Sequence, residues 1–152
     1  MRQHDHRALL IETLVNLKET EKWLRHSYEV CVPIGIKNNY TISEWDALEA
    51  LTSRFARTTD LISNKVLRAI DYIEFEYQQG TLLDVMNRSH KRGLIGSVEE
   101  MHDIKDLRNT ITHEYAAAQL KIIFQEVLEA TPKLFTLIQN IHNYCDKILN
   151  NS

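Results

Sequence analysis

Residues 108–115, RNTITHEY, gather side chains that can act on an anionic substrate within eight positions of the chain. An imidazole has an ordinary pKa of about 6.5, so the side chain of His113 can accept or donate a proton at neutral pH. The guanidinium of Arg108 is always charged and can hold two oxygens of one anion. Asn109 and Tyr115 add an amide and a phenol. The same residues also suit the solvated face of a helix, which is the simpler interpretation of the pattern.

The spacing constrains how these side chains can meet. On an ideal helix Asn109 and His113 share one face, while Arg108 lies about 140° around the axis from His113. One straight helix therefore cannot bring Arg108 and His113 to the same small ligand. Two alternatives remain open. The helix breaks near the β-branched residues 110–112, or a second copy of the chain completes the site.

Composition limits the kind of protein that carries this stretch. The chain has 152 residues, of which 43% are hydrophobic, so it can bury one core as a single domain over residues 1–152. Only four glycines and two prolines occur, which favours long helices. A net charge of −3 excludes bulk electrostatic coating of nucleic acid, so any RNA contact has to be local. No apolar segment is long enough to span a membrane, and we predict a cytoplasmic protein without membrane contact. Cys31 and Cys145 lack metal-ligand spacing and are predicted to be reduced, buried side chains.

Apolar periodicity predicts helices along the whole chain. The first breaks at Pro33 and Gly35, and the second begins with Ser43 as its N-cap. Ser97 and Glu100 form a predicted capping-box pair. The expected segments are residues 5–28, 43–80 with a bend near 58–60, 82–90, and 97–111.

The last third carries the most regular apolar stripe. Positions alternate in steps of three and four through Pro132, which is predicted to kink the helix or to start a new one. We expect an all-α fold, an antiparallel bundle of four to five helices. The stripe consists of Leu120, Phe124, Val127, Thr131, Leu134, Ile138, Ile141, Cys145 and Ile148.

The spacing of Arg108, four residues, His113, one residue and Tyr115 resembles the signature of the HEPN superfamily. It is most similar to HepT-like toxins, which are paired with a minimal nucleotidyltransferase antitoxin. Asn109 directly after the arginine, the chain length and the long following helix with its proline agree with this resemblance. The likeness outside residues 97–150 is only architectural.

The resemblance implies a metal-independent endoribonuclease that works as a homodimer without a cofactor. His113 would be the base that takes the proton of the ribose 2′-hydroxyl. Arg108 would hold two oxygens of the scissile phosphate, and Asn109 would orient one of these oxygens. Tyr115 would be the residue that the partner nucleotidyltransferase adenylylates, which silences the enzyme. By residue pattern alone Tyr115 is a half-buried side chain with its hydroxyl at the surface.

Other interpretations stay open. The chain is alternatively a non-catalytic binding subunit that presents substrate to a nucleotidyltransferase, or a helical interaction module. Two further charge clusters are candidates for RNA phosphate contacts or are simply solvated: Arg88, His90, Lys91 and Arg92, and Arg54, Arg57, Lys65 and Arg68. The large aromatic residues are predicted to pack in the core: Trp23, Trp45, Phe55 and Phe124.

Overall fold

The chain folds into helices throughout the part that the computed structural model describes, which is residues 3–74, 80–111 and 117–150. No strand occurs in these ranges. The helices are α1 (Gln3–Ile34), α2 (Ile42–Leu61), the π-helical turn η1 (Ile62–Val66), α3 (Leu67–Ile73), α4 (Leu82–Lys91), α5 (Val98–Thr110) and α6 (Ala117–Asn150). Since α2, η1 and α3 follow without interruption, the described residues form a bundle of five helical rods. The prediction of an all-α bundle is confirmed.

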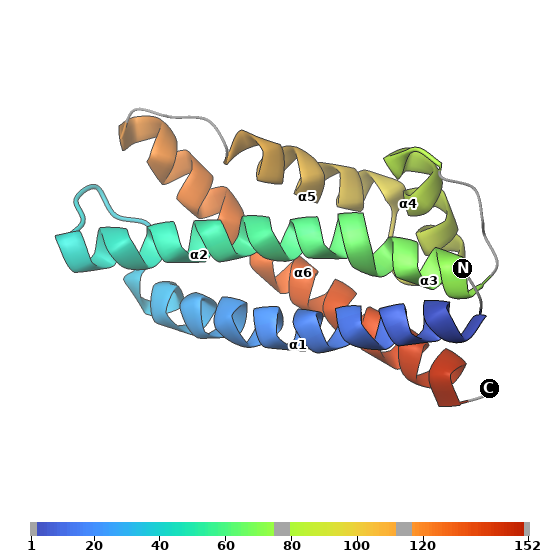
Figure 1. Cartoon of the computed structure of the whole chain (residues 1–152). Helices are drawn as coiled ribbons and strands as arrows, with labels where there is room; N and C mark the ends of the chain where they lie inside the picture. The colour runs from blue at the N-terminus through green and yellow to red at the C-terminus, as the bar shows by residue number, and fades with distance from the viewer. Residues whose placement is uncertain (1–2, 75–79, 112–116, 151–152) are drawn as a thin grey trace.

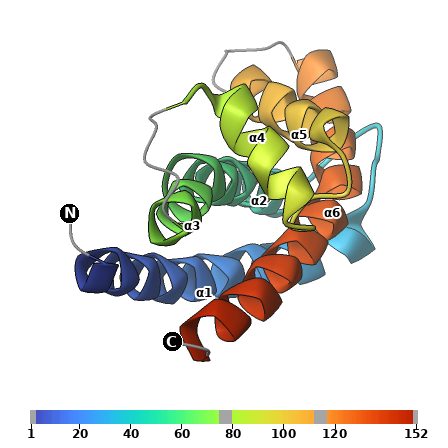
Figure 2. The ribbon, with the colours of Figure 1, turned by 90° about the vertical axis from the view of Figure 1, so that its right-hand side faces the viewer.

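Successive long helices run in opposite directions (Figure 1). α1 and α2 lie side by side as a hairpin with the most extensive helix contact in the fold, and α5 runs antiparallel to α2. α6 crosses the other helices obliquely and contacts α1, α2 and α5. The short helix α4 packs on α3 and α5 at one end of the bundle (Figure 2). None of the described helices is long and apolar enough to cross a membrane.

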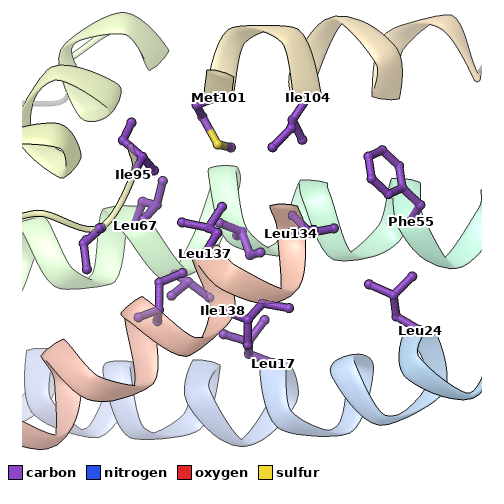
Figure 3. Packing of buried hydrophobic residues seen from close by; sticks show 14 of the residues in the cluster. Leu17, Leu24, Phe55, Leu67, Ile95, Met101, Ile104, Leu134, Leu137 and Ile138 are labelled. Atoms are coloured by element: carbon purple, nitrogen blue, oxygen red, sulfur yellow. The ribbon is translucent and has the colours of Figure 1, made fainter. Parts of the chain in front are cut away.

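The core lies where α6 passes between the α1–α2 hairpin and α5 (Figure 3). α1 places Leu10, Leu17, Leu24 and Cys31 at intervals of seven residues, and all four are 0% exposed. This spacing keeps one side of a helix facing its neighbour over its whole length. The stripe of α6 meets that side, and every member from Phe124 to Cys145 is buried.

The ends of α1 and α2 differ from the sequence prediction. α1 continues past Tyr28 and through Pro33, because a proline in the last turn removes only one backbone hydrogen bond. The helix ends at Ile34, directly before Gly35, which was one of the two predicted break residues. Gly35 has a left-handed φ of 63°, and its N–H bonds to the Cys31 carbonyl at 3.0 Å. α2 begins one residue after Thr41, not after Ser43. Thr41 is the N-cap and forms a reciprocal capping box with Glu44.

The second rod contains a π-helical turn, η1, which begins two residues after Asp60 and so lies near the bend predicted at residues 58–60. In η1 the Leu67 N–H bonds to the Ile62 carbonyl, five residues earlier. The rod ends at Ile73 rather than at Gly80, and residues 75–79 lie outside the described ranges. The predicted helix over 82–90 is confirmed, with Thr81 as its N-cap.

Pro132 neither ends α6 nor starts a new helix. α6 is continuous over 34 residues with the proline inside it, so the prediction of a separate helix is wrong. The stripe on both sides of Pro132 is covered by other helices of the same chain. These contacts hold the helix together at the missing hydrogen bond, and the stripe needs no second copy to cover it.

Candidate functional site

Helix α5 positions the arginine of the motif. Its N-terminus is fixed by the Ser97 hydroxyl, which accepts a hydrogen bond from the Glu100 N–H at 3.0 Å, the hydroxyl half of the predicted capping box. The helix packs on the core through Met101, Ile104 and Leu107, which are buried. α5 ends at Thr110, where the run of β-branched residues begins. This is the helix break that was one of the two alternatives for the site.

Arg108 is held by Asp60 of α2 through two hydrogen bonds. Arg108 Nε donates to Asp60 Oδ1 at 2.7 Å, and Arg108 Nη2 donates to Asp60 Oδ2 at 2.7 Å. A two-pronged, charge-assisted contact fixes the orientation of the guanidinium as well as its position. Asp60 uses two of the five N–H donors of an arginine, so three are not engaged by it. The Arg108 side chain is 20% exposed, and an anion can reach it from solvent.

Lys105 and Ser63 complete this group, which we call the Arg108 cluster (Asp60, Ser63, Lys105 and Arg108). Lys105 Nζ lies 3.5 Å from Asp60 Oδ1 and 3.4 Å from Ser63 Oγ. The hydrogen bond from Arg108 lowers the pKa of Asp60 below its ordinary value of 3.8, and the same bond raises the pKa of Arg108. At neutral pH two cations therefore face one carboxylate, and the cluster keeps a net positive charge.

The other predicted site residues are placed only in part. Asn109 is exposed at the end of α5. His113 and Tyr115 lie outside the described residues, between α5 and α6. The approach of His113 to Arg108 therefore stays a prediction.

The two edges of α5 carry opposite charge. The edge toward α2 carries Lys105 and Arg108, whereas the edge toward α6 borders a hollow of about 210 Å³. Four carboxylates and one lysine line that hollow: Glu100, Asp103, Glu126, Glu129 and Lys133. A phosphate group is repelled from the α6 side of α5 and attracted to the α2 side.

Two arginines of the cluster around residues 88–92 have a structural role, whereas His90 and Lys91 are exposed. Arg88 donates to the buried Asp71 carboxylate through Nε at 3.0 Å and Nη2 at 2.9 Å. Arg92 contacts the other oxygen of Asp71 and also pairs with Glu74, Nε to Oε1, at 3.0 Å. The Arg92 side chain is 10% exposed, so it is neither a solvated loop charge nor open to RNA. These ion pairs fasten α4 and the segment after it to α3.

Trp23 corrects the prediction for the aromatic residues. Phe55 and Phe124 are buried, and Trp45 packs on Phe124 with ring centroids 5.4 Å apart. The Trp23 side chain is instead on the surface, with the residue 45% exposed. A helical wheel shows why, because Trp23 lies about 100° from Leu24 and off the buried stripe of α1.

Three residues of the Arg108 cluster were not found from the sequence. Asp60, Ser63 and Lys105 come from α2, η1 and α5, and the Asp60–Arg108 contact joins residues 48 positions apart. No local spacing encodes such a contact. The only available signal was a carboxylate near the predicted bend of the second rod.

Comparison with protein-family models, with curated proteins and with solved structures finds no match to this chain.

Proposed function

We propose that this chain is a metal-independent endoribonuclease, the toxin of a toxin–antitoxin pair in which a minimal nucleotidyltransferase is the neutralising partner. The proposal combines the resemblance of residues 108–115 to HepT-like toxins with the chemistry of the Arg108 cluster. The single observation that supports it best is the fixed guanidinium at the end of α5, directly before the segment that contains His113.

Arg108 is suited to hold a phosphate that gains charge during a reaction. Because Asp60 already orients the guanidinium, little rotational freedom is lost when an anion binds the remaining N–H groups. Lys105 offsets the charge of Asp60, so the carboxylate does not cancel the attraction of Arg108 for a phosphate. An ion pair that only stabilises the helix packing is the competing explanation of this geometry.

In the proposed reaction His113 removes the proton from the 2′-hydroxyl of the ribose. The 2′-oxygen attacks the adjacent phosphorus, the bond from phosphorus to the 5′-oxygen breaks, and that oxygen takes a proton from solvent. The products are a 2′,3′-cyclic phosphate and a 5′-hydroxyl. Arg108 stabilises the extra negative charge on the phosphoryl oxygens, and Asn109 orients the phosphate. The nucleophile belongs to the substrate, so the step requires neither a metal-bound water nor a cofactor.

A second copy of the chain belongs to the proposal, with two motifs facing each other in a C2 homodimer. The α6 stripe gives no reason for a dimer, since it is buried within one chain. The helix break at the end of α5 also removes the need for a second copy to complete the site, so the remaining reason is the resemblance to HepT-like toxins, which implies two motifs facing each other. Sedimentation velocity at micromolar concentration is expected to give about twice the mass of the chain, and a monomer at all concentrations contradicts this part of the proposal.

The test of the activity is cleavage of RNA by purified protein in the presence of a chelator. His113→Ala and Arg108→Ala are each expected to abolish cleavage while the helical circular dichroism is retained. His102→Ala is the matched control, because His102 lies on α5 with a side chain 61% exposed and pairs only with Asp106 among the described residues. This variant is expected to cleave RNA at the wild-type rate.

Three outcomes separate the alternatives. Cleavage that disappears in chelator, or persists at full rate in both variants, refutes the mechanism. RNA binding without cleavage by the wild-type protein favours the alternative of a non-catalytic binding subunit. A chain that neither binds nor cleaves RNA is a helical interaction module.

A further inference from the structure

A hollow of about 230 Å³ lies on the outer side of the α1–α2 hairpin. The residues that line it are Glu19, Thr20, Trp23, Arg54 and Arg57. It combines an exposed indole with two guanidinium groups, whereas the other edge of the candidate site, toward α6, is acidic. Aromatic faces beside arginines are the features that proteins use to bind single-stranded nucleic acid, through base stacking and phosphate contacts.

The indole and one arginine are held in place before any ligand binds. Trp23 Nε1 donates to Glu19 Oε1 at 3.1 Å, which fixes the ring on the surface of α1. The Arg54 guanidinium lies 5.3 Å from the centroid of that ring and donates to Ser27 Oγ at 2.6 Å. Rigid groups lose little entropy on binding, so this arrangement favours recognition of a flexible partner.

Arg57 is the cation of this surface that is available to bind a phosphate. It is exposed, and within residues 3–74, 80–111 and 117–150 no hydrogen bond or ion pair engages it. It is placed at the rim of the hollow, three residues before Asp60 on α2. Three residues correspond to about 4.5 Å along a helix axis, so Arg57 lies about one turn from the Arg108 cluster.

The surface continues from Trp23 in the other direction along the hairpin. A second hollow of about 160 Å³ shares Arg54 and is lined mostly by small and apolar groups of α1 and α2. Its residues are His26, Ser27, Val30, Ala47, Ala50 and Arg54. An extended strand that leaves the Arg108 cluster along α2 therefore passes the exposed Arg57, then the ring of Trp23, and then the second hollow.

We propose that this surface, the Trp23 subsite (Trp23, Arg54 and Arg57), binds single-stranded RNA beside the scissile phosphate. One base stacks on Trp23, and Arg57 binds a backbone phosphate between that base and Arg108. A single strand fits because its bases are free to stack, while the bases of a duplex are already stacked on each other. The inference rests on the proposed function for its direction toward the cut site, but binding at Trp23 does not require cleavage.

The experiment measures binding of a fluorescein-labelled single-stranded oligoribonucleotide to His113→Ala protein by anisotropy. In this background Trp23→Ala is expected to weaken binding by about 5- to 100-fold, the usual effect of losing one stacked base. Trp23→Phe keeps an aromatic face and is expected to retain most of the affinity. Ile42→Ala and Lys18→Ala are the matched controls, because both residues are exposed and lie outside the subsite; each is expected to bind like the parent.

Arg57→Glu tests the phosphate contact without touching the core. It is expected to weaken binding at least 10-fold, and Arg57→Ala is expected to reduce the slope of log K against log salt by about 0.7, the value for one phosphate of a single strand. A duplex of the same sequence should bind similarly to all variants. If Trp23→Ala and Arg57→Glu bind the single strand as tightly as Ile42→Ala does, the Trp23 subsite is refuted.

A second measurement separates this inference from the proposed function. In the His113-containing protein Trp23→Ala is expected to raise KM for RNA cleavage and leave kcat unchanged, because the indole touches substrate away from the reacting atoms. If the wild-type chain does not cleave RNA but binding still depends on Trp23 and Arg57, the subsite stands and the endoribonuclease proposal fails. Loss of kcat with unchanged KM would overturn the assignment of Trp23 to substrate binding.

Discussion

The contact between Asp60 and Arg108 gives the sharpest test of the candidate site. Exposed ion pairs contribute roughly 0.2–1 kcal/mol, and charge-assisted hydrogen bonds about 1.5–3 kcal/mol. The two side chains are 34% and 20% exposed, so solvent screening reduces the upper figure. We expect a coupling energy of about 1.5 kcal/mol for the two-pronged pair, between these limits.

The assay is a double-mutant cycle by urea unfolding at one protein concentration, with Asp60→Ala, Arg108→Ala and the double variant. With a urea m-value of about 2 kcal/mol per molar, the expected coupling corresponds to a midpoint shift of about 0.75 M. The cycle of Asp60 with Lys105→Ala is the control. Its coupling should be smaller, about 0.5 kcal/mol, because Lys105 makes a single contact of 3.5 Å with Asp60.

The pH dependence of the coupling follows from the lowered pKa of Asp60. A carboxyl with a folded-state pKa below its unfolded value of 3.8 stabilises the protein fully above that value. The stabilisation is lost as the pH falls below 3.8 through the folded-state pKa. Coupling below about 0.3 kcal/mol at pH 7, or coupling that survives protonation of Asp60, would refute the argument that Asp60 preorganises Arg108. If Asp60 preorganises Arg108, Asp60→Ala is expected to slow RNA cleavage by about 10- to 100-fold, because a small displacement of a reacting group lowers the rate by such a factor.

Three other predictions concern different parts of the chain. Co-expression with a cognate nucleotidyltransferase is expected to add one or more AMP masses to Tyr115 and to stop RNA cleavage, because each added phosphate competes with RNA for Arg108. The Tyr115→Phe variant is expected to stay unmodified. An unchanged intact mass, with toxicity still neutralised, would exclude this regulation. Asp71→Ala removes the buried carboxylate that binds Arg88 and Arg92 and is expected to cost about 1.5–3 kcal/mol in urea unfolding, whereas a loss under about 0.5 kcal/mol would mean that the ion pairs contribute little. Burial raises the pKa of Cys31 to about 11 and of Cys145 to about 12, so neither thiol should react with a disulfide reagent at pH 8 until the protein is unfolded; rapid labelling of the native chain would contradict their burial.

The fold was predictable where one period persists over many residues. The α6 stripe runs in steps of three and four from Leu120 to Ile148 and identified both the helix and its buried side. The wrong predictions concern single residues that can either end a helix or be accommodated within it. Pro33 and Pro132 were expected to disrupt helices, but one lies in a last turn and the other in a helix held on several sides by its neighbours.

The candidate site was predictable only as a list of residue types. The pattern that selected Arg108 contains no information about Asp60, because their contact depends on how α2 and α5 pack. A rotation of one residue around α1 separates the exposed Trp23 from the buried Leu24. The apolar character of tryptophan led to the prediction that Trp23 packs in the core. The geometry at the end of α5 depends on where that helix stops, which a run of β-branched residues suggests without determining.

The order of the helices along the chain affects folding during synthesis. α1 and α2 are neighbours in sequence, and closing the short connection between them costs little entropy, so the hairpin can form early. Its buried sides, however, are covered largely by α6, the last helix of the described chain. A ribosome adds roughly 5–20 residues per second, so for several seconds the emerging hairpin exposes Leu17, Leu24 and Phe55 to solvent. During that interval the hairpin presents apolar surface that later helices cover, and the Arg108 cluster is incomplete until α5 has emerged.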